Sequence, residues 1–230
     1  MVKMNEFLKR MFLFLMSPVY GRGIINAFDN GKSCVKENYD RFHAKTALQR
    51  YFFLAKEEIV LLCGKLSADV YENSLTMLAL SWAYSRNENL KVTVYVRSNE
   101  IESLAFRSFL LSHGAGLYIG VEDSKQYPYV SDLVKSLPDF CLVDGTHVRE
   151  EIDKDTRAAK LLINKNNRAE FLQRRINSVK SLLTAPQKKR KNIVFENVTN
   201  VCNAEKEKLN VSFTVPSRVE KCSSTTYSKF

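Results

Sequence analysis

EIVLLCGKLSADVYENSLTMLALSWAYSRNENLKVTVYVR, residues 58–97, is the stretch that decides the fold of this 230-residue chain. It opens with a short apolar run, Glu58–Cys63, that ends at Gly64, a pattern typical of a strand buried on both faces. Apolar residues then recur at helical spacing and predict a helix over 67–86. Residues 91–97 are rich in β-branched side chains and predict a second strand. This order predicts a right-handed crossover between parallel strands.

The alternation of helices and strands continues toward the C-terminus. Ser98 and Asn99 are favourable N-cap residues and predict a helix through about residue 112. The remaining predicted elements are strands at 117–121 and 140–144, a strand at 149–152 that pairs with 140–144 as a hairpin, and an amphipathic helix over 169–183. We therefore expect an α/β fold with a mostly parallel sheet flanked by helices.

In such sheets, ligands bind beyond the carboxyl ends of the strands. This rule marks an expected functional rim formed by Gly64, Lys65, Arg97, Ser98 and residues 145–149.

Two flanking segments differ in composition from the α/β part. Residues 1–50 are expected to form an N-terminal helical arm, with helices over 5–16 and from 37 to about 55 joined by a Gly/Asn-rich connection over 20–33. Residues 51–184 are the expected α/β domain. Residues 185–230 begin with APQKKRK and end with SSTTYSKF, which predicts a basic, partly disordered tail.

Composition limits the class of protein. Lys and Arg total 35 against 25 Asp and Glu, a net charge of +10, which leaves nucleic acid, an anionic membrane or an acidic protein as electrostatic partners. An apolar content of 45% excludes a collagenous or wholly disordered chain. The five cysteines form no C-x-x-C pair and no histidine flanks them at zinc-finger spacing, so we expect neither a metal nor a cofactor. The apolar run at 11–16 is too short to span a membrane, and we expect a cytoplasmic protein without stable membrane insertion.

Over residues 50–184 the sequence resembles half of a phospholipase D-like domain. The resemblance rests on the segments EIVLLCGKLSADVYENSLTMLA, KVTVYVR, FCLVDGTHVREEID and LLINKNNRAEFLQRRINSVKSLL. The catalytic motif of that family is His-x-Lys-x-x-x-x-Asp, and its Asp ends a strand as Asp144 does before Gly145. Counting back from Asp144 places Leu137 at the His position and Asp139 at the Lys position.

The resemblance implies that the fold has lost the chemistry of the family. Phosphodiester cleavage needs an imidazole that forms the phospho-enzyme and a cation that holds the phosphate oxygens. Leu137 does neither, and Asp139 repels a phosphate. The resemblance also implies a homodimer, because active members with one half-domain per chain commonly pair two chains around one site.

Two other groups of residues contain histidine. His43, Ala44 and Lys45 repeat the His-x-Lys spacing, but Arg50 stands at the Asp position and the context predicts an ordinary amphipathic helix. The second group is either an acid–base or metal cluster of a divergent phosphodiesterase or nuclease, or a solvated hairpin with paired charges. Its members are His147, Glu150, Glu151 and Asp153. Phosphate-loop, dinucleotide-binding, nucleophile-elbow and HExxH signatures are absent from the sequence.

The positive charge gathers toward the C-terminal end. Residues 185–230 hold nine basic and four acidic residues, which is half of the net charge. Clustered cations bind phosphates with salt-dependent, sequence-independent affinity. We therefore expect a non-catalytic protein that binds nucleic acid or a nucleoprotein partner, with a protein–protein adaptor as a further alternative. The expected contact residues are Arg174, Arg175, Lys188, Lys189, Arg190 and Lys191.

Overall fold

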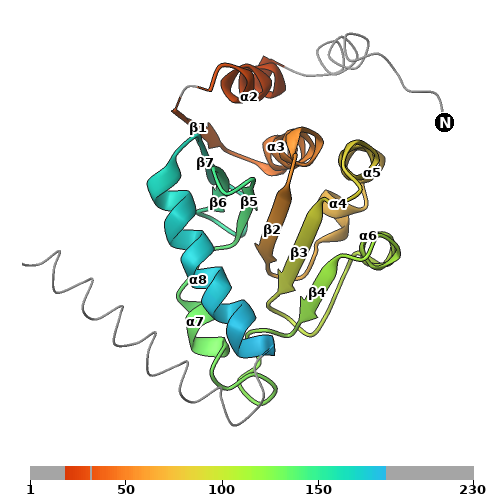
Figure 1. Cartoon of the computed structure of the whole chain (residues 1–230), viewed down its shortest axis with the longest axis vertical. Coiled ribbons are helices and arrows are strands. Elements are labelled where there is room, and N and C mark those ends of the chain that lie inside the picture. Colours follow the sequence, from red (N-terminus) through yellow and green to blue (C-terminus); the bar gives the residue numbers. More distant parts are fainter. Residues whose placement is uncertain (1–18, 32, 185–230) are drawn as a thin grey trace, which may run out of the picture.

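The structure is a computed structural model that describes residues 19–31 and 33–184. It contains a seven-stranded sheet in the order β1-β7-β6-β5-β2-β3-β4. The strands are β1 (Cys34–Asn38), β2 (Glu58–Cys63), β3 (Lys91–Val96), β4 (Gly116–Ile119), β5 (Phe140–Val143), β6 (His147–Glu151) and β7 (Ala159–Ile163). The helices are α2 (Val19–Asp29), α3 (Arg41–Leu54), α4 (Ala68–Tyr71), α5 (Ser74–Arg86), α6 (Leu104–Ser112), α7 (Ser131–Lys135) and α8 (Asn166–Thr184). Figure 1 shows α8 lying across one face of the sheet.

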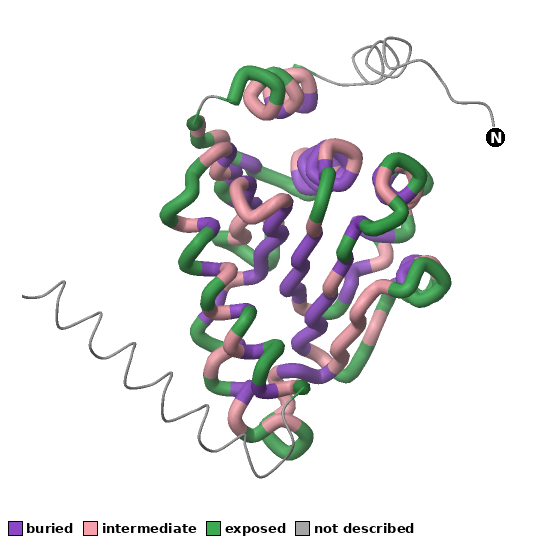
Figure 2. The backbone as a smooth tube through the Cα atoms, viewed as in Figure 1, coloured by how far each residue is buried: buried purple, intermediate pink, exposed green. Residues whose placement is uncertain are grey.

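Strand β2 lies in the middle of the sheet and is buried from Ile59 to Cys63 (Figure 2). Its side chains alternate between two cores, since Ile59 and Leu61 belong to one cluster and Val60 and Leu62 to the other. A strand covered on both faces needs apolar residues at every position, which explains the unbroken run in the sequence.

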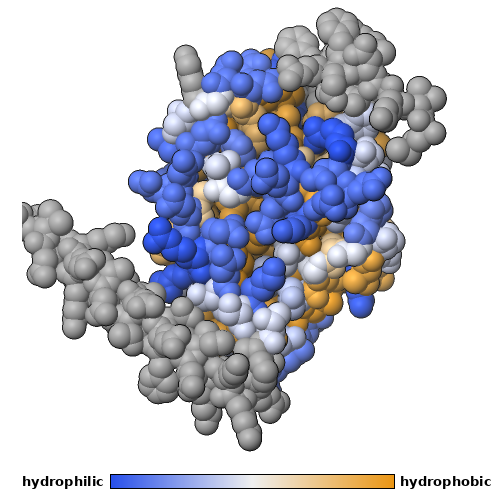
Figure 3. All heavy atoms as spheres, viewed as in Figure 1, coloured by the Kyte–Doolittle hydropathy of each residue, from blue (hydrophilic) through white to orange (hydrophobic). Residues whose placement is uncertain are grey.

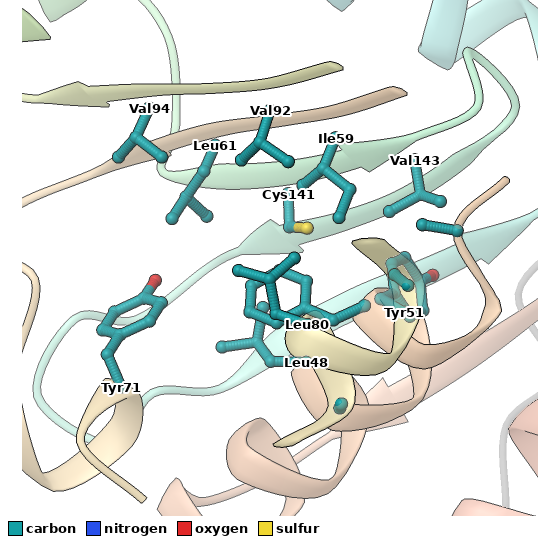
Figure 4. Close-up of a cluster of buried hydrophobic side chains, with 14 of the residues drawn as sticks. Leu48, Tyr51, Ile59, Leu61, Tyr71, Leu80, Val92, Val94, Cys141 and Val143 are labelled. Carbon is teal, nitrogen blue, oxygen red and sulfur yellow. The ribbon is translucent and has the colours of Figure 1, made fainter. Parts of the chain in front are cut away.

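Each core lies between the sheet and one layer of helices. The first receives residues from α2 through α6, and Figure 4 shows Leu48 and Leu80 from two of these helices facing Ile59, Leu61 and Cys141 of the strands. The second is closed by α7 and α8. Because β2, β3 and β5 contribute to both cores, the sheet is the shared interior of a three-layer α/β fold.

The α/β class predicted from the sequence is confirmed, but the sheet is mixed rather than mostly parallel. Strands β2, β3 and β4 pair in parallel. The other pairs, β2 with β5, β5 with β6, β6 with β7 and β7 with β1, are antiparallel. Short loops join β5 to β6 and β6 to β7, and connections of that length permit only antiparallel pairing.

The direction of β5 also changes the predicted functional rim. Gly64, Lys65, Arg97 and Ser98 follow β2 and β3 at their carboxyl ends, as expected. Because β5 runs the opposite way, its end lies beside the start of β2, where the Asp144 N–H donates to the Glu58 carbonyl. The inclusion of Gly145 in the rim was therefore wrong, and Asp139 lies there in its place.

The N-terminal part differs from its prediction in two places. Helix α2 replaces the expected connection over 20–33, and β1 occupies the start of the helix expected from residue 37. Helix α3 begins at Arg41 because the Asp40 side chain caps it, accepting a hydrogen bond from the His43 N–H at 2.8 Å. Residues 19–50 thus add a strand to the sheet and Ile24 and Leu48 to the core, whereas the helix predicted over 5–16 lies outside the described residues.

Three further elements differ locally from their predictions. The helix expected over 67–86 breaks before Asn73, whose side chain accepts from the Leu75 N–H and starts α5. The helix expected from Ser98 begins at Leu104, because the Ser98 hydroxyl instead accepts from the Glu100 N–H in a turn. Strand β7 was not predicted. Among the described helices, none is long and apolar enough to cross a membrane.

Candidate functional site

Helix α8 presents the basic surface that the sequence predicts. Ala169, Leu172, Ile176, Val179 and Leu182 recur at helical spacing and are buried against the sheet. The rest of the helix carries Arg168, Arg174, Arg175 and Lys180 against a single carboxylate, Glu170. This surface, over the left of Figure 3, is predominantly hydrophilic.

The three arginines of α8 have different partners. Arg168 forms a bidentate pair with Glu150, with nitrogen–oxygen distances of 2.8 and 2.5 Å. Arg174 pairs with Glu170 one turn earlier at 3.3 Å, and both side chains are exposed. Arg175 lies 5.4 Å from the centre of the Phe171 ring and makes no ion pair with a carboxylate within residues 19–31 and 33–184. Arg175 is therefore the α8 arginine whose charge no described carboxylate neutralises.

The predicted contact residues are only partly within the structure. Arg174 and Arg175 are consecutive on α8, where Arg174 is exposed and Arg175 is half-buried at the edge of the face that packs on the sheet. Lys188, Lys189, Arg190 and Lys191 lie outside the described residues.

The two positions that match the family's His and Lys have structural roles. Leu137 is buried in the core beneath α7 and α8. Asp139 is also buried and accepts a hydrogen bond from Nε of Arg97 at 2.5 Å. The other Arg97 nitrogens donate to the carbonyls of Val134 at 2.8 Å and Leu137 at 2.6 Å. Each guanidinium nitrogen of Arg97 therefore has an acceptor. Through these bonds the end of β3 is held to the segment from α7 to Asp139.

Asp144, which matches the family's Asp, is also held by the backbone. Its carboxylate accepts hydrogen bonds from the N–H groups of Lys56, Glu57 and Glu58, at distances from 2.8 to 3.1 Å. Its φ of 49° is left-handed, as the turn into Gly145 requires. Asp144 therefore holds the backbone of residues 56–58 at the start of β2.

The residues of the predicted His147 cluster do not converge. His147 is buried, its ring stacks on that of Phe28 with centroids 3.8 Å apart, and its Nδ1 accepts from the Asn164 N–H at 3.4 Å. Burial lowers the pKa of His147 to about 4, so the ring is neutral at pH 7. Because side chains alternate along β6, Glu150 points to the opposite face and pairs with Arg168.

The other two acidic residues of this group also have local partners. Glu151 lies between Arg149 at 3.4 Å and Arg157 at 3.2 Å, and burial raises its pKa despite these two cations. Asp153 is exposed and accepts from the N–H of Asp155, a bond that lowers its pKa. Within the described residues no three His, Cys, Asp or Glu side chains are placed to hold a metal ion.

At the carboxyl end of β2 lies a polar cluster of which the sequence analysis named Arg149 and Glu151 but not Ser67 or Arg157. Arg149 and Arg157 flank Glu151, and Arg157 also donates to the Ser67 hydroxyl at 2.5 Å. The cluster lines a cavity of about 20 Å³, room for about one water molecule. The sequence HVREE could have predicted part of this cluster, because side chains alternate along a strand and Arg149 and Glu151 therefore lie on one face.

Comparisons with known proteins give structural similarity alone. No protein-family model and no curated protein matches the sequence. Among solved structures, Nuc from Salmonella typhimurium, a phospholipase D family member, is 20% identical with a TM-score of 0.46, over 64% of this chain and 93% of Nuc. NucT from Helicobacter pylori is 9% identical with a TM-score of 0.42, over 65% of this chain and 97% of NucT.

A DNA-binding protein also matches. TrmBL2, an archaeal chromatin protein with a novel mode of DNA binding, is 12% identical with a TM-score of 0.43, over 62% of this chain and 50% of TrmBL2.

Proposed function

We propose that this chain is a non-catalytic, cytoplasmic protein that binds nucleic acid, free or within a nucleoprotein complex, through the basic surface of α8 and the Lys188–Lys191 cluster that follows it. The observation that carries this proposal is the charge of α8, which has four cations and one carboxylate of its own on a helix whose other side is buried. Glu150 of β6 and Glu170 pair with Arg168 and Arg174, so the excess rests on Arg175 and Lys180. Guanidinium and ammonium groups on one face bind successive phosphates and release their counterions.

The burial of Leu137 and Asp139 supports the non-catalytic part of the proposal. A nucleophile must reach the phosphorus atom, but the side chain at 137 is apolar and packed in the core. The side chain at 139 is an anion already bound to Arg97. Neither position offers a group that attacks or holds a phosphodiester.

Binding of the full chain to labelled DNA and RNA across a salt series tests the proposal. We expect the logarithm of affinity to fall linearly with the logarithm of salt concentration, with a slope that decreases by about 1 for each phosphate contact removed. Arg175→Gln weakens binding and lowers the slope. Arg107→Gln removes the same charge from the exposed side of α6, on the other face of the sheet, and leaves both unchanged.

The tail requires its own matched pair of variants. Replacing Lys188, Lys189, Arg190 and Lys191 with Ala is expected to reduce affinity strongly. Replacing Lys206, Lys208, Arg218 and Lys221 removes the same charge from the same tail, and a smaller effect is expected because these cations are dispersed. Undetectable binding at low salt, or equal binding by wild type and both the Arg175 and the 188–191 variants, contradicts the proposal.

A further inference from the structure

Phe171 lies within the basic surface of α8 as an aromatic ring between two guanidinium groups. It follows Arg168 by three residues and precedes Arg175 by four, so the three side chains share one stripe of the helix. The guanidinium carbons of Arg168 and Arg175 lie 4.9 and 5.4 Å from the ring centre. Phe171 is nevertheless 39% exposed, although α8 buries five other apolar side chains.

The two arginines differ in their freedom to move. Arg168 is anchored to β6 by both oxygens of Glu150, which also neutralise its charge. Arg175 has the ring as its neighbour and no carboxylate pair among the described residues. Arg175 is therefore able to leave the ring for a phosphate at little electrostatic cost, and the ring face is then available for stacking.

We propose that Phe171 and Arg175 bind one nucleotide of a single strand, with an unpaired base stacked on Phe171 and its phosphate held by Arg175. This inference rests on the proposed function and deepens it by naming single-stranded nucleic acid as the favoured partner. A base stacked on an aromatic ring is a stronger contact than a cation over a ring at an exposed site, so the exchange is favourable. In a duplex the base faces are already stacked on one another, and only the phosphates remain for Arg175.

A purely structural role for Phe171 makes a different prediction. If the ring only positions Arg168 and Arg175, its removal weakens contacts with phosphates and reduces binding of single strands and duplexes by the same factor. The ratio of the two affinities therefore separates stacking from positioning.

The experiment measures the affinity of the full chain for a 20-nucleotide single strand and for the corresponding duplex at fixed salt. Phe171→Ala is expected to weaken single-strand binding about fivefold or more and duplex binding less than twofold. Phe171→Leu keeps the apolar bulk without the aromatic face and is expected to behave like Phe171→Ala, whereas Phe171→Trp retains or strengthens binding. Phe42→Ala removes a ring that is 59% exposed on α3, away from α8, and leaves both affinities unchanged.

Fluorescence gives a second readout. Trp82 is the single tryptophan of the chain, so Trp82→Phe combined with Phe171→Trp leaves one reporter on α8. We expect single strands to quench this reporter and duplexes to leave it unquenched. Equal losses for both ligands in Phe171→Ala, or a wild-type preference for duplex, overturn the stacking inference while salt-dependent binding upholds the proposed function. A wild-type chain that binds neither ligand overturns the proposed function and the inference with it.

Discussion

Truncating Asp139 to Ala leaves the Arg97 guanidinium buried without its carboxylate. Asp139 is 4% and Arg97 6% exposed, and their charged atoms lie 2.5 Å apart. Removing one partner of a buried ion pair costs about 3–5 kcal/mol of unfolding free energy. The carboxylate of Glu122 lies 3.6 Å from Arg97 and is partly exposed, so it compensates in part. We therefore expect Asp139→Ala to lose about 3 kcal/mol, the lower end of that range.

Urea unfolding at pH 7, monitored by circular dichroism, measures this loss of unfolding free energy. Asp139→Asn keeps a hydrogen-bond acceptor for Arg97 without the charge, and we expect an intermediate loss. Asp139→Lys installs the residue type of the family motif, and we expect the largest loss because an ammonium then faces the buried guanidinium. The control is Asp132→Ala, which removes an exposed carboxylate from α7.

A double replacement tests the physical reason. The double variant that combines Arg97→Met with Asp139→Leu buries no ion and therefore carries no desolvation cost. We expect it to be more stable than Asp139→Ala alone. A loss below about 1 kcal/mol in Asp139→Ala, or a double variant whose loss equals the sum of its single losses, refutes the assignment of a coupled buried pair.

Four further predictions concern His147, Asp144, the oligomeric state and catalysis. Because the folded chain holds His147 neutral with a pKa of about 4 whereas the unfolded chain takes up a proton near pH 6.5, the free energy of unfolding is undiminished well above pH 6.5 and falls by about 3 kcal/mol as pH drops to 4; His147→Gln flattens a urea-midpoint profile over this window. Asp144→Ala leaves three N–H groups without their acceptor and lowers the unfolding free energy by about 2 kcal/mol, and a loss as small as that of Asp132→Ala argues against a stabilising role of these hydrogen bonds. Light scattering is expected to report twice the 26.4 kDa chain mass, and a monomer contradicts the homodimer implied by the family resemblance. Phosphodiester substrates are expected to remain intact with Mg²⁺, Mn²⁺ or Zn²⁺, and metal-dependent cleavage abolished by His147→Ala supports the nuclease alternative instead.

The central strands show how far the sequence predicts this fold. Strand β2 has its predicted bounds, and β3 and β5 are each one residue shorter than expected. Burial on both faces requires apolar residues along each of these strands, and the resulting apolar runs are easily recognised in the sequence. Strand β1 was missed because CVKEN is short and polar and pairs only with β7, which lies far away in the sequence. Strand β7 was missed although it also pairs with its neighbour β6, because AKLLI is short and shows no clear alternation.

The candidate site was likewise predictable from the sequence only in part. The charge of Arg174 and Arg175 and their position on an amphipathic helix follow from spacing alone. That Arg174 is neutralised by Glu170 follows from spacing as well, since the two are one turn apart. The pairing of Arg168 with Glu150 depends on how α8 lies across β6, and this is what distinguishes Arg175 from its neighbours.

The sequence by itself determined the α/β class, the central strands, the basic final helix and the absence of His and Lys from the family's motif positions, because each is a property of local residue type and period. Tertiary structure decided the mixed direction of the sheet, the burial of His147 against Phe28 and the pairing of Asp139 with Arg97. The two side-chain contacts join residues far apart in the sequence, with 42 positions between Arg97 and Asp139 and 119 between Phe28 and His147. Contacts of that range depend on which strands pair and in which direction. Short loops determine the antiparallel pairing of β5 with β6 and of β6 with β7, but no local pattern encodes the pairing of β5 with β2.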